Sequence, residues 1–262
     1  MSSPRVLLFT VDRGVATLTL NRPERLNALN LELKACLADA IAEIGGRADI
    51  RAVVVTGAGR AFCSGGDVRE MDAARTSHEV RQRLLAMHHK VIIPLTRLEK
   101  PVIAVVNGAA VGAGFSLALA CDFVFAAESA SFSMIFTQRG LVPDSGIAYL
   151  LPRLIGMARA KELAYTGRRI EAAEACKLGL VLRVESDAEV LERAVEFARS
   201  LAAGASVALG LTKRLLEQSL QSTIEEMADY EACVVPLSVA TEDHAEGIKA
   251  FAEKRAPRFT GR

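Results

Sequence analysis

The chain has 262 residues, of which 51% are hydrophobic and 24% are charged, a balance typical of a soluble globular protein with a sizeable core. The net charge is only +1, and the chain contains three Tyr and no Trp. Nucleic-acid binding depends on excess positive charge and often on aromatic surface, so a general nucleic-acid binder is disfavoured.

The five cysteines are scattered singly, with no CxxC pair and no zinc-ligand spacing. Isolated thiols in apolar segments are typical of a reducing compartment and predict no metal site. No apolar stretch approaches the roughly 20 residues of a membrane span. The apolar run 5–11 is too short for a signal peptide and is followed at once by Asp12 and Arg13. We therefore expect a cytoplasmic protein with no membrane partner and no metal.

The first half of the chain alternates strand-like and helix-like patterns. Two apolar runs, 5–11 and 15–20, flank a tight DRG turn and predict a hairpin. Apolar residues recur at helical spacing over 27–44, and the β-branched run 51–57 predicts a strand buried on both faces. A glycine-rich loop follows that strand, and residues 77–99 then predict one long helix.

The second half repeats the alternation and then becomes helical. Buried strands are predicted at 102–108 and 121–127, with a glycine-opened helix between them, and a further strand is predicted at 178–184. Strands that alternate with helices indicate an α/β core with mainly parallel pairing. Because no strand pattern follows residue 200, we divide the chain into a core, 1–200, and a helical unit, 201–262.

Two glycine-rich loops each follow a buried strand. In the first, Gly65 and Gly66 leave backbone N–H groups free to point outward, while Phe62 replaces the third glycine of a dinucleotide fingerprint. In the second, Gly112 and Gly114 open a helix whose first N–H groups have no partner within the helix. Each loop alone is also typical of an ordinary turn or a close-packed helix start. Together they predict one N–H apiece for a single oxyanion.

Asp144 is the most suggestive carboxylate. It follows Pro143 in GLVPDSG, just before an apolar helix, and the pattern fits a helix cap and a catalytic acid–base equally well. Ser116, Asp144 and His244 also occur in the chain order of an α/β-hydrolase triad. Ser116 lies inside a helix pattern, however, and His244 lies in a charged segment, so a serine hydrolase is the weaker alternative.

Taken together, several segments resemble the crotonase family, the enoyl-CoA hydratase/isomerase superfamily. The matching segments are RPERLNAL (22–29), RAVVVTGAGRAFCSGGDVREM (51–71), KPVIAVVNGAAVGAGFSLALACDFVFAAESASF (100–132), GLVPDSG (140–146), TGRRIEAAEACKLGLV (166–181) and GIKAFAEKRAPRFTGR (247–262). The resemblance implies an α/β spiral of repeated ββα units with a helical C-terminal trimerisation region. It also implies an acyl-CoA thioester substrate, a homotrimer or a dimer of trimers, and no cofactor beyond the coenzyme A moiety of the substrate.

The resemblance also assigns site residues. The N–H groups of Gly66 and Ala113 take the oxyanion positions, and Asp144 takes the position of a lone catalytic carboxylate. The remaining residues fall where the family contacts coenzyme A: Arg25, Leu26, Ser64, Gly66, Asp67 and Val68, together with Phe251 and Lys254 on a tail helix that can reach a neighbouring subunit's ligand.

The chain departs from the hydratase pattern at two positions. Hydratases of the family use two glutamates, and Ser116 and Phe136 stand there instead. Neither residue titrates as a base near neutral pH, so the sequence favours an isomerase that moves a proton with Asp144 alone. GLVPDSG and the tail most resemble the isomerases of ring-epoxidised phenylacetyl-CoA and related double-bond isomerases. Open alternatives are a hydratase of fatty-acid or aromatic-acid degradation, a covalent role for Asp144 as in the family's dehalogenases, and a non-catalytic acyl-CoA-binding subunit.

Overall fold

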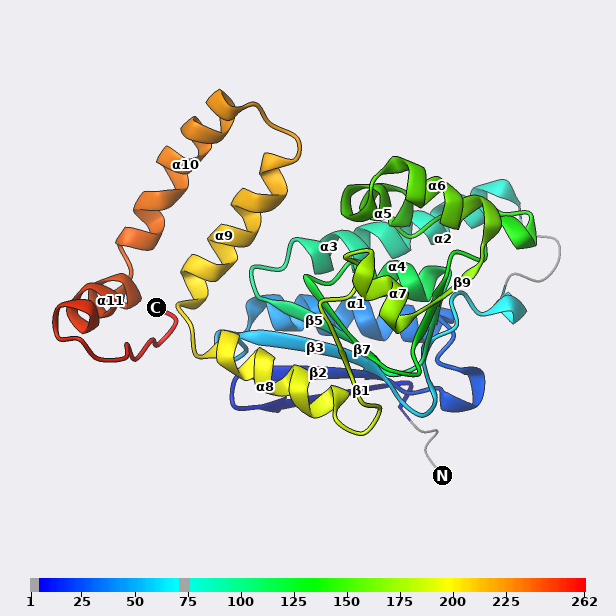
Figure 1. Cartoon of the computed structure of the whole chain (residues 1–262), viewed down its shortest axis with the longest axis horizontal. Helices are drawn as coiled ribbons and strands as arrows, with labels where there is room; N and C mark the ends of the chain where they lie inside the picture. Colours follow the sequence, from blue (N-terminus) through cyan, green and yellow to red (C-terminus); the bar gives the residue numbers. More distant parts are fainter. Residues whose placement is uncertain (1–4, 71–75) are drawn as a thin grey trace.

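The computed structural model describes residues 5–70 and 76–262. The larger of its two sheets has six strands in the order β1-β2-β3-β5-β7-β10 (Figure 1). These strands are β1 (Leu7–Asp12), β2 (Val15–Leu20), β3 (Ala52–Gly57), β5 (Val102–Val106), β7 (Phe123–Ala127) and β10 (Arg183–Glu185). Pairing is antiparallel in the β1–β2 hairpin and parallel from β2 to β10, as the alternation of strands and helices predicts.

In a second, smaller sheet, each of the first three strands follows a strand of the larger sheet along the chain. Its four strands, in the order β4-β6-β8-β9, are β4 (Ala61–Cys63), β6 (Ala109–Val111), β8 (Ser131–Ser133) and β9 (Arg169–Glu171). The chain passes from β3 to β4, from β5 to β6 and from β7 to β8, and a helix follows each pair. This repeated strand–strand–helix unit is the ββα spiral that the resemblance implies, and the prediction of that fold is confirmed.

Helices cover both faces of the larger sheet and form the C-terminal region. They are α1 (Leu31–Gly46), α2 (Ser77–Met87), the π-helical turn η3 (His88–Ile92), α3 (Ile93–Thr96), α4 (Ala113–Leu119), α5 (Ile147–Ile155), α6 (Met157–Thr166), α7 (Ala172–Lys177), α8 (Val190–Ala202), α9 (Ser206–Ser219), α10 (Ile224–Val239) and α11 (Glu242–Ala252). Short 3-10 turns form η1 (Pro23–Arg25), η2 (Val68–Glu70) and η4 (Thr137–Arg139).

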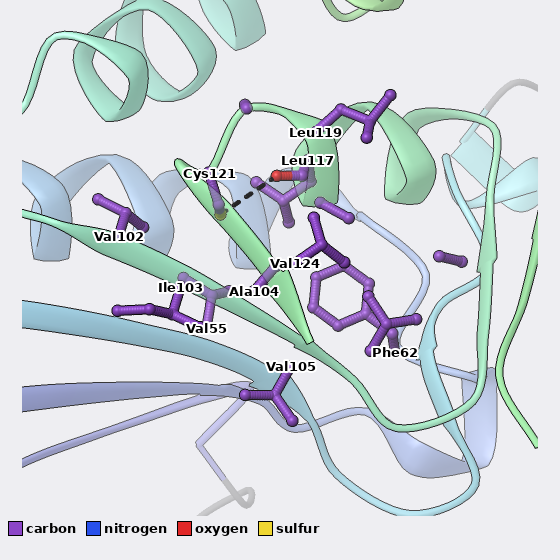
Figure 2. Close-up of a cluster of buried hydrophobic side chains, with 14 of the residues drawn as sticks. Val55, Phe62, Val102, Ile103, Ala104, Val105, Leu117, Leu119, Cys121 and Val124 are labelled. Carbon is purple, nitrogen blue, oxygen red and sulfur yellow. Dashed lines mark hydrogen bonds between the residues drawn. The ribbon is translucent and has the colours of Figure 1, made fainter. Parts of the chain in front are cut away.

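The core lies on both sides of the larger sheet because alternate side chains of a strand point to opposite faces. Phe123 and Phe125 of β7 pack against Phe197 of α8, with ring centroids 5.1 and 5.4 Å apart. Val124, between them, lies on the other face beside Leu117 of α4 (Figure 2). The sheet therefore holds α4, and with it the glycine turn before α4, in a rigid apolar setting.

Three predicted elements begin or end differently in the structure. The helix expected from residue 27 begins at Leu31, because Leu26 and Asn27 have left-handed φ values of 49° and 56° and Asn30 caps the helix. The long helix expected over 77–99 is interrupted by the π-helical turn η3 and ends at Thr96. At the end of the π-helical turn, the N–H of Ile93 donates to the carbonyl of His88, five residues back, and the next residue, Pro94, has no N–H to donate.

The strand expected over 178–184 is shorter in the structure. Helix α7 ends at Lys177, and the chain then turns through Gly179, whose φ is +84°. Only Arg183–Glu185 pairs with the sheet, as β10.

Residues 203–262 fold as α9, α10 and α11, which extend away from the sheets (Figure 1). The predicted boundary after residue 200 falls in the last turn of α8, and the division into two units stays a prediction. No single helix in the described ranges has the length and apolarity to cross a membrane. Helices α8 and α9 have that length and apolarity only when they are taken together, and the chain bends by 104° between them.

Candidate active site

The two segments in which the resemblance expects coenzyme A contacts, 22–29 and 64–68, lie side by side. The N–H of Ser64 donates to the carbonyl of Leu26 at 3.0 Å, and the N–H of Leu29 donates to the carbonyl of Gly65 at 2.8 Å. The side-chain amide of Asn27, fully buried, donates to the carbonyl of Ala61 at 2.8 Å. These bonds hold the strained backbone after η1 in one conformation, which is the usual condition for left-handed non-glycine residues at functional sites.

Asp67 is fixed by an ion pair inside this loop pair. Its carboxylate accepts a hydrogen bond from Arg22 at 2.9 Å, and both side chains are nearly inaccessible to solvent. Burial opposes the charge of Asp67, but the bonds from the Arg22 guanidinium and the Arg69 N–H outweigh it and hold the pKa of the carboxyl below its ordinary value. Its carboxylate therefore holds the two loops together, and the backbone and the exposed side chain of Val68 remain available to a ligand.

The two predicted oxyanion donors lie at adjacent chain turns. Gly65 has a φ of +97°, and a Cβ added there would lie 2.8 Å from the carbonyl oxygen of Val111 and 3.6 Å from the nitrogen of Ala113. Neither the N–H of Gly66 nor that of Ala113 donates a hydrogen bond to any residue in the described ranges. Two N–H groups without acceptors on neighbouring turns suit an anionic oxygen.

Asp144 does not cap the following helix. Helix α5 begins at Ile147, and its N-cap is Gly146, with a φ of +83° and no side-chain cap bond. The helix-cap interpretation of Asp144 is therefore wrong. After Asp144 the backbone turns through Ser145, a buried residue with a left-handed φ of 53°, a strained conformation that is common at functional sites.

The Asp144 side chain is partly buried, and its carboxyl lacks a full set of partners. Its Oδ1 atom is inaccessible to solvent and has no hydrogen-bond partner in the described part of the chain. Burial raises the pKa of the carboxyl, and the Ser145 hydroxyl and the charges of His88 and Lys34 oppose that rise only in part. A buried carboxylate with an unpaired oxygen and a raised pKa has the properties of a general base.

Ser116 and Phe136 lie at the same place, around the start of α4. The hydroxyl oxygen of Ser116 lies 3.2 Å from the carbonyl oxygens of both Gly112 and Asp144, to which it can donate a hydrogen bond. Ser116 therefore joins α4 to the turn that carries Asp144. The Phe136 ring lies 3.7 Å from where a Cβ on Gly112 would be. The two positions at which the resemblance expects glutamates thus carry a fully buried hydroxyl and an apolar ring.

The hydrolase triad is not assembled. Ser116 contacts the backbone carbonyl of Asp144 and lies inside α4, while His244 is exposed on α11. Figure 1 shows α11 and α4 in different parts of the molecule. This arrangement provides no imidazole for Ser116.

Phe251 and Lys254 also lie apart from the other predicted ligand contacts. Phe251 is 87% exposed on α11, at the end of the molecule opposite to α2 and the 64–70 loop (Figure 1). Contact with a neighbouring subunit's coenzyme A stays a prediction. Within the described ranges, no group of three His, Cys, Asp or Glu side chains could hold a metal ion.

Sequence reasoning missed Arg22, Asn27 and His88 as parts of this site. Arg22 and Asn27 lie in the RPERLNAL segment, but nothing in their spacing shows that Arg22 pairs with Asp67, 45 residues away. The sequence also does not show that the π-helical turn places His88 near enough for its charge to act on Asp144.

Comparison with known proteins identifies the family. Residues 10–262 match the enoyl-CoA hydratase/isomerase family, and the chain belongs to that family. It is 40% identical to the 1,2-epoxyphenylacetyl-CoA isomerase of Escherichia coli (strain K12), with 98% of each chain covered. It is 37% identical to the short-chain-enoyl-CoA hydratase of Clostridium acetobutylicum, with 92% of each covered. The enoyl-CoA hydratase structure from Bacillus anthracis superposes with a TM-score of 0.93 at 37% identity, covering 98% of this chain and 100% of that one.

Proposed function

We propose that the protein is an enoyl-CoA isomerase that uses Asp144 as its single base and the N–H groups of Gly66 and Ala113 as oxyanion donors. The observation that carries this proposal is the buried, unpartnered Oδ1 of Asp144, in a site where Ser116 and Phe136 supply no second carboxylate. The name of the Escherichia coli relative, an isomerase of a coenzyme A thioester, supports the same class of reaction.

The reaction moves one proton and one double bond. Asp144 takes a proton from C2 of a β,γ-unsaturated thioester, and the electron pair of that C–H bond delocalises into a dienolate whose negative charge lies on the thioester oxygen. The N–H groups of Gly66 and Ala113 stabilise that oxygen, and loss of one such donor typically costs about 3–4 kcal/mol. Asp144 then returns the proton at C4, so the double bond ends in conjugation with the carbonyl and no cofactor is consumed.

The raised pKa of Asp144 suits this proton transfer. A carboxylate whose pKa is raised toward the working pH is a stronger base than an ordinary one. The same carboxylic acid, once it has taken the proton, is a good donor to C4. Burial thus tunes one group for both half-reactions.

Hydration needs a group that activates water, and this site lacks the usual one. The Ser116 hydroxyl already contacts two backbone carbonyls, and Phe136 is apolar and buried. A relative in the same family is named a hydratase, so isomerisation and hydration have to be distinguished with separate substrates.

The test follows enoyl-thioester absorbance with two substrates. With 3-hexenoyl-CoA we expect absorbance to rise as the double bond becomes conjugated, and with crotonyl-CoA we expect it to hold steady. A fall with crotonyl-CoA at a comparable rate would show water addition and contradict the single-base proposal. Absence of any change with 3-hexenoyl-CoA would contradict isomerisation of simple β,γ-enoyl thioesters.

A further inference from the structure

Ser116 is a fully buried residue in the middle of α4 whose hydroxyl lies within reach of two backbone carbonyls. One is the carbonyl of Gly112, one turn earlier in the chain, and the other is that of Asp144, 28 residues away. A serine that bonds to the carbonyl four residues back is common inside helices and indicates no function by itself. The contact with Asp144 is different, because it joins two separate segments of the candidate active site.

The Gly112 carbonyl belongs to the same peptide unit as one of the proposed oxyanion donors. A trans peptide unit is planar, so the carbonyl of Gly112 and the N–H of Ala113 point in opposite directions from one rigid plane. The carbonyl accepts the N–H of Ser116 at 3.0 Å and lies 3.2 Å from its hydroxyl oxygen. Bonds to this carbonyl therefore fix the direction of the Ala113 N–H, and they also polarise that N–H as a donor.

The backbone conformation of Gly112 makes these bonds important. Its φ and ψ are 54° and −122°, a combination that glycine adopts readily because it has no side chain. Glycine also has the greatest freedom to leave such a conformation. The N–H of Gly112 is held by the carbonyl of Ser133 at 2.9 Å, and the bonds from Ser116 hold the other side of the turn.

The same hydroxyl contacts the backbone of the proposed base. The carbonyl of Asp144 and its side chain leave from one Cα atom, so a bond to that carbonyl restrains the position of the carboxyl. Each of the two carbonyls also accepts a backbone N–H, from Ser116 at 3.0 Å for Gly112 and from Ile147 at 3.2 Å for Asp144. Removal of the hydroxyl thus leaves both carbonyls with a partner and removes only the link between the two segments.

We propose that Ser116 is a positioning residue that holds the Ala113 N–H and the Asp144 turn in register, so that donor and base act on the same thioester. The inference rests on the proposed function, which gives these two groups their roles. A misplacement of about 1 Å can cost about 100-fold in rate. The loss is therefore expected in kcat rather than in binding.

The first test compares Ser116→Ala with Thr56→Val as the matched control. The buried Thr56 hydroxyl also donates to a backbone carbonyl, that of Val105, at 3.1 Å, but this bond joins β3 to β5. Both variants lose one buried hydroxyl bond, so their melting temperatures should fall by similar amounts. With 3-hexenoyl-CoA, Ser116→Ala should lose about 10- to 100-fold in kcat with KM nearly unchanged, whereas Thr56→Val should keep the wild-type kcat.

A second test does not depend on turnover. Acetoacetyl-CoA loses a proton between its two carbonyls and gives an enolate that absorbs in the near ultraviolet, and N–H donors at the thioester oxygen stabilise this anion. A pH titration of the bound ligand should give an ionisation constant about tenfold lower on Ser116→Ala than on the wild type, because a displaced donor loses part of its effect. The constant on Thr56→Val should match that of the wild type.

Three outcomes would overturn the inference. They are a wild-type value for Ser116→Ala in either test, a rise in KM with kcat unchanged, and an equal loss of kcat in Thr56→Val, which would trace the loss to stability. If the wild-type protein does not isomerise 3-hexenoyl-CoA, the enolate titration alone decides. A lower ionisation constant confined to Ser116→Ala would then support the positioning role and remove only the proposed function.

Discussion

At the scale of single residues, Asp144 combines two properties that folding stability alone would not select. One oxygen of its partly buried carboxyl is inaccessible to solvent and unpaired, and the desolvation raises the pKa of the group. An unsatisfied buried polar group usually costs about 1–3 kcal/mol. Other parts of the fold offset such a cost, as is common where a site needs a reactive group.

Asp144→Asn is expected to raise the melting temperature at neutral pH. The folded pKa lies above the ordinary value of about 3.9, so the folded chain holds the proton more tightly than the unfolded chain does. Ionised Asp144 therefore costs stability above the folded pKa, and the cost disappears as the pH falls below the unfolded one. Each 1 kcal/mol gained should raise the melting temperature by about 2–4 °C at this chain length.

Thermal denaturation at several pH values checks this expectation, with Asp229→Asn on the exposed side of α10 as the control. The stabilisation should shrink as the pH is lowered and should be absent in the control. A melting temperature that falls in Asp144→Asn at pH 7 would mean that the carboxylate is held by favourable bonds.

At the scale of elements, close packing of α4 on β4 positions the proposed oxyanion donors. A Cβ added at Gly114 would lie 2.3 Å from the carbonyl oxygen of Cys63 and 2.7 Å from the Cys63 Cβ. The first turn of α4 therefore lies directly on the strand that leads into Gly66. Any side chain at position 114 would push the start of α4 away from this strand.

Gly114→Ala is expected to move the start of α4 and to separate the Ala113 N–H from that of Gly66. Loss of one oxyanion donor lowers kcat by about 100- to 1,000-fold in other enzymes, and overpacking costs about 1–3 kcal/mol of stability. Gly46→Ala is the control, because nothing lies within 4 Å of an added Cβ there. Steady-state isomerase rates and melting curves measure both effects, and wild-type values for Gly114→Ala would show that the contact does not position the donor.

At the scale of the whole molecule, the C-terminal region is tied to the core by a few buried polar contacts. Arg51 at the start of β3 donates to the Ser206 hydroxyl at 2.7 Å and to the carbonyl of Gly204. Near the C-terminus, the N–H groups of Thr260 and Gly261 donate to the buried carboxylate of Asp243 at 2.6 and 2.8 Å. The Arg51 bonds fix where α9 begins relative to β3, and the Asp243 bonds hold the C-terminal tail against α11.

The C-terminal helices also present apolar side chains to solvent. Ile224, Leu237 and Phe251 are 78%, 58% and 87% exposed. Such surface is typical of an interface. The expected homotrimer or dimer of trimers stays a prediction.

The sequence predicted the long elements of the fold better than the short ones. The β-branched runs that became β3 and β5 are buried over their whole length, so their pattern was unambiguous. Strands β4, β6, β8 and β9 have three residues each, too few to show a period, so only the family resemblance, with its repeated ββα units, pointed to them.

Asp144 and the two glycine loops could be proposed from the sequence, whereas their distances and the parts played by Arg22, Asn27 and His88 could not. The glycines of the two loops marked the N–H donors, because glycine at a strand end has a recognisable pattern. The state of Asp144 depended on Gly146 as the true cap and on burial by distant segments, which one sequence does not encode locally. The ion pair of Arg22 with Asp67 was hidden for the same reason.

The isomerisation rate of 3-hexenoyl-CoA by Asp144→Asn tests whether this one carboxylate carries the proton. Coenzyme A thioester affinity should remain within a few-fold of wild type, and kcat should fall by about 100-fold or more, the usual contribution of a general base. Asp229→Asn, measured in parallel, should retain the wild-type rate. A folded Asp144→Asn protein that binds the thioester and keeps more than a tenth of the wild-type kcat would contradict the account.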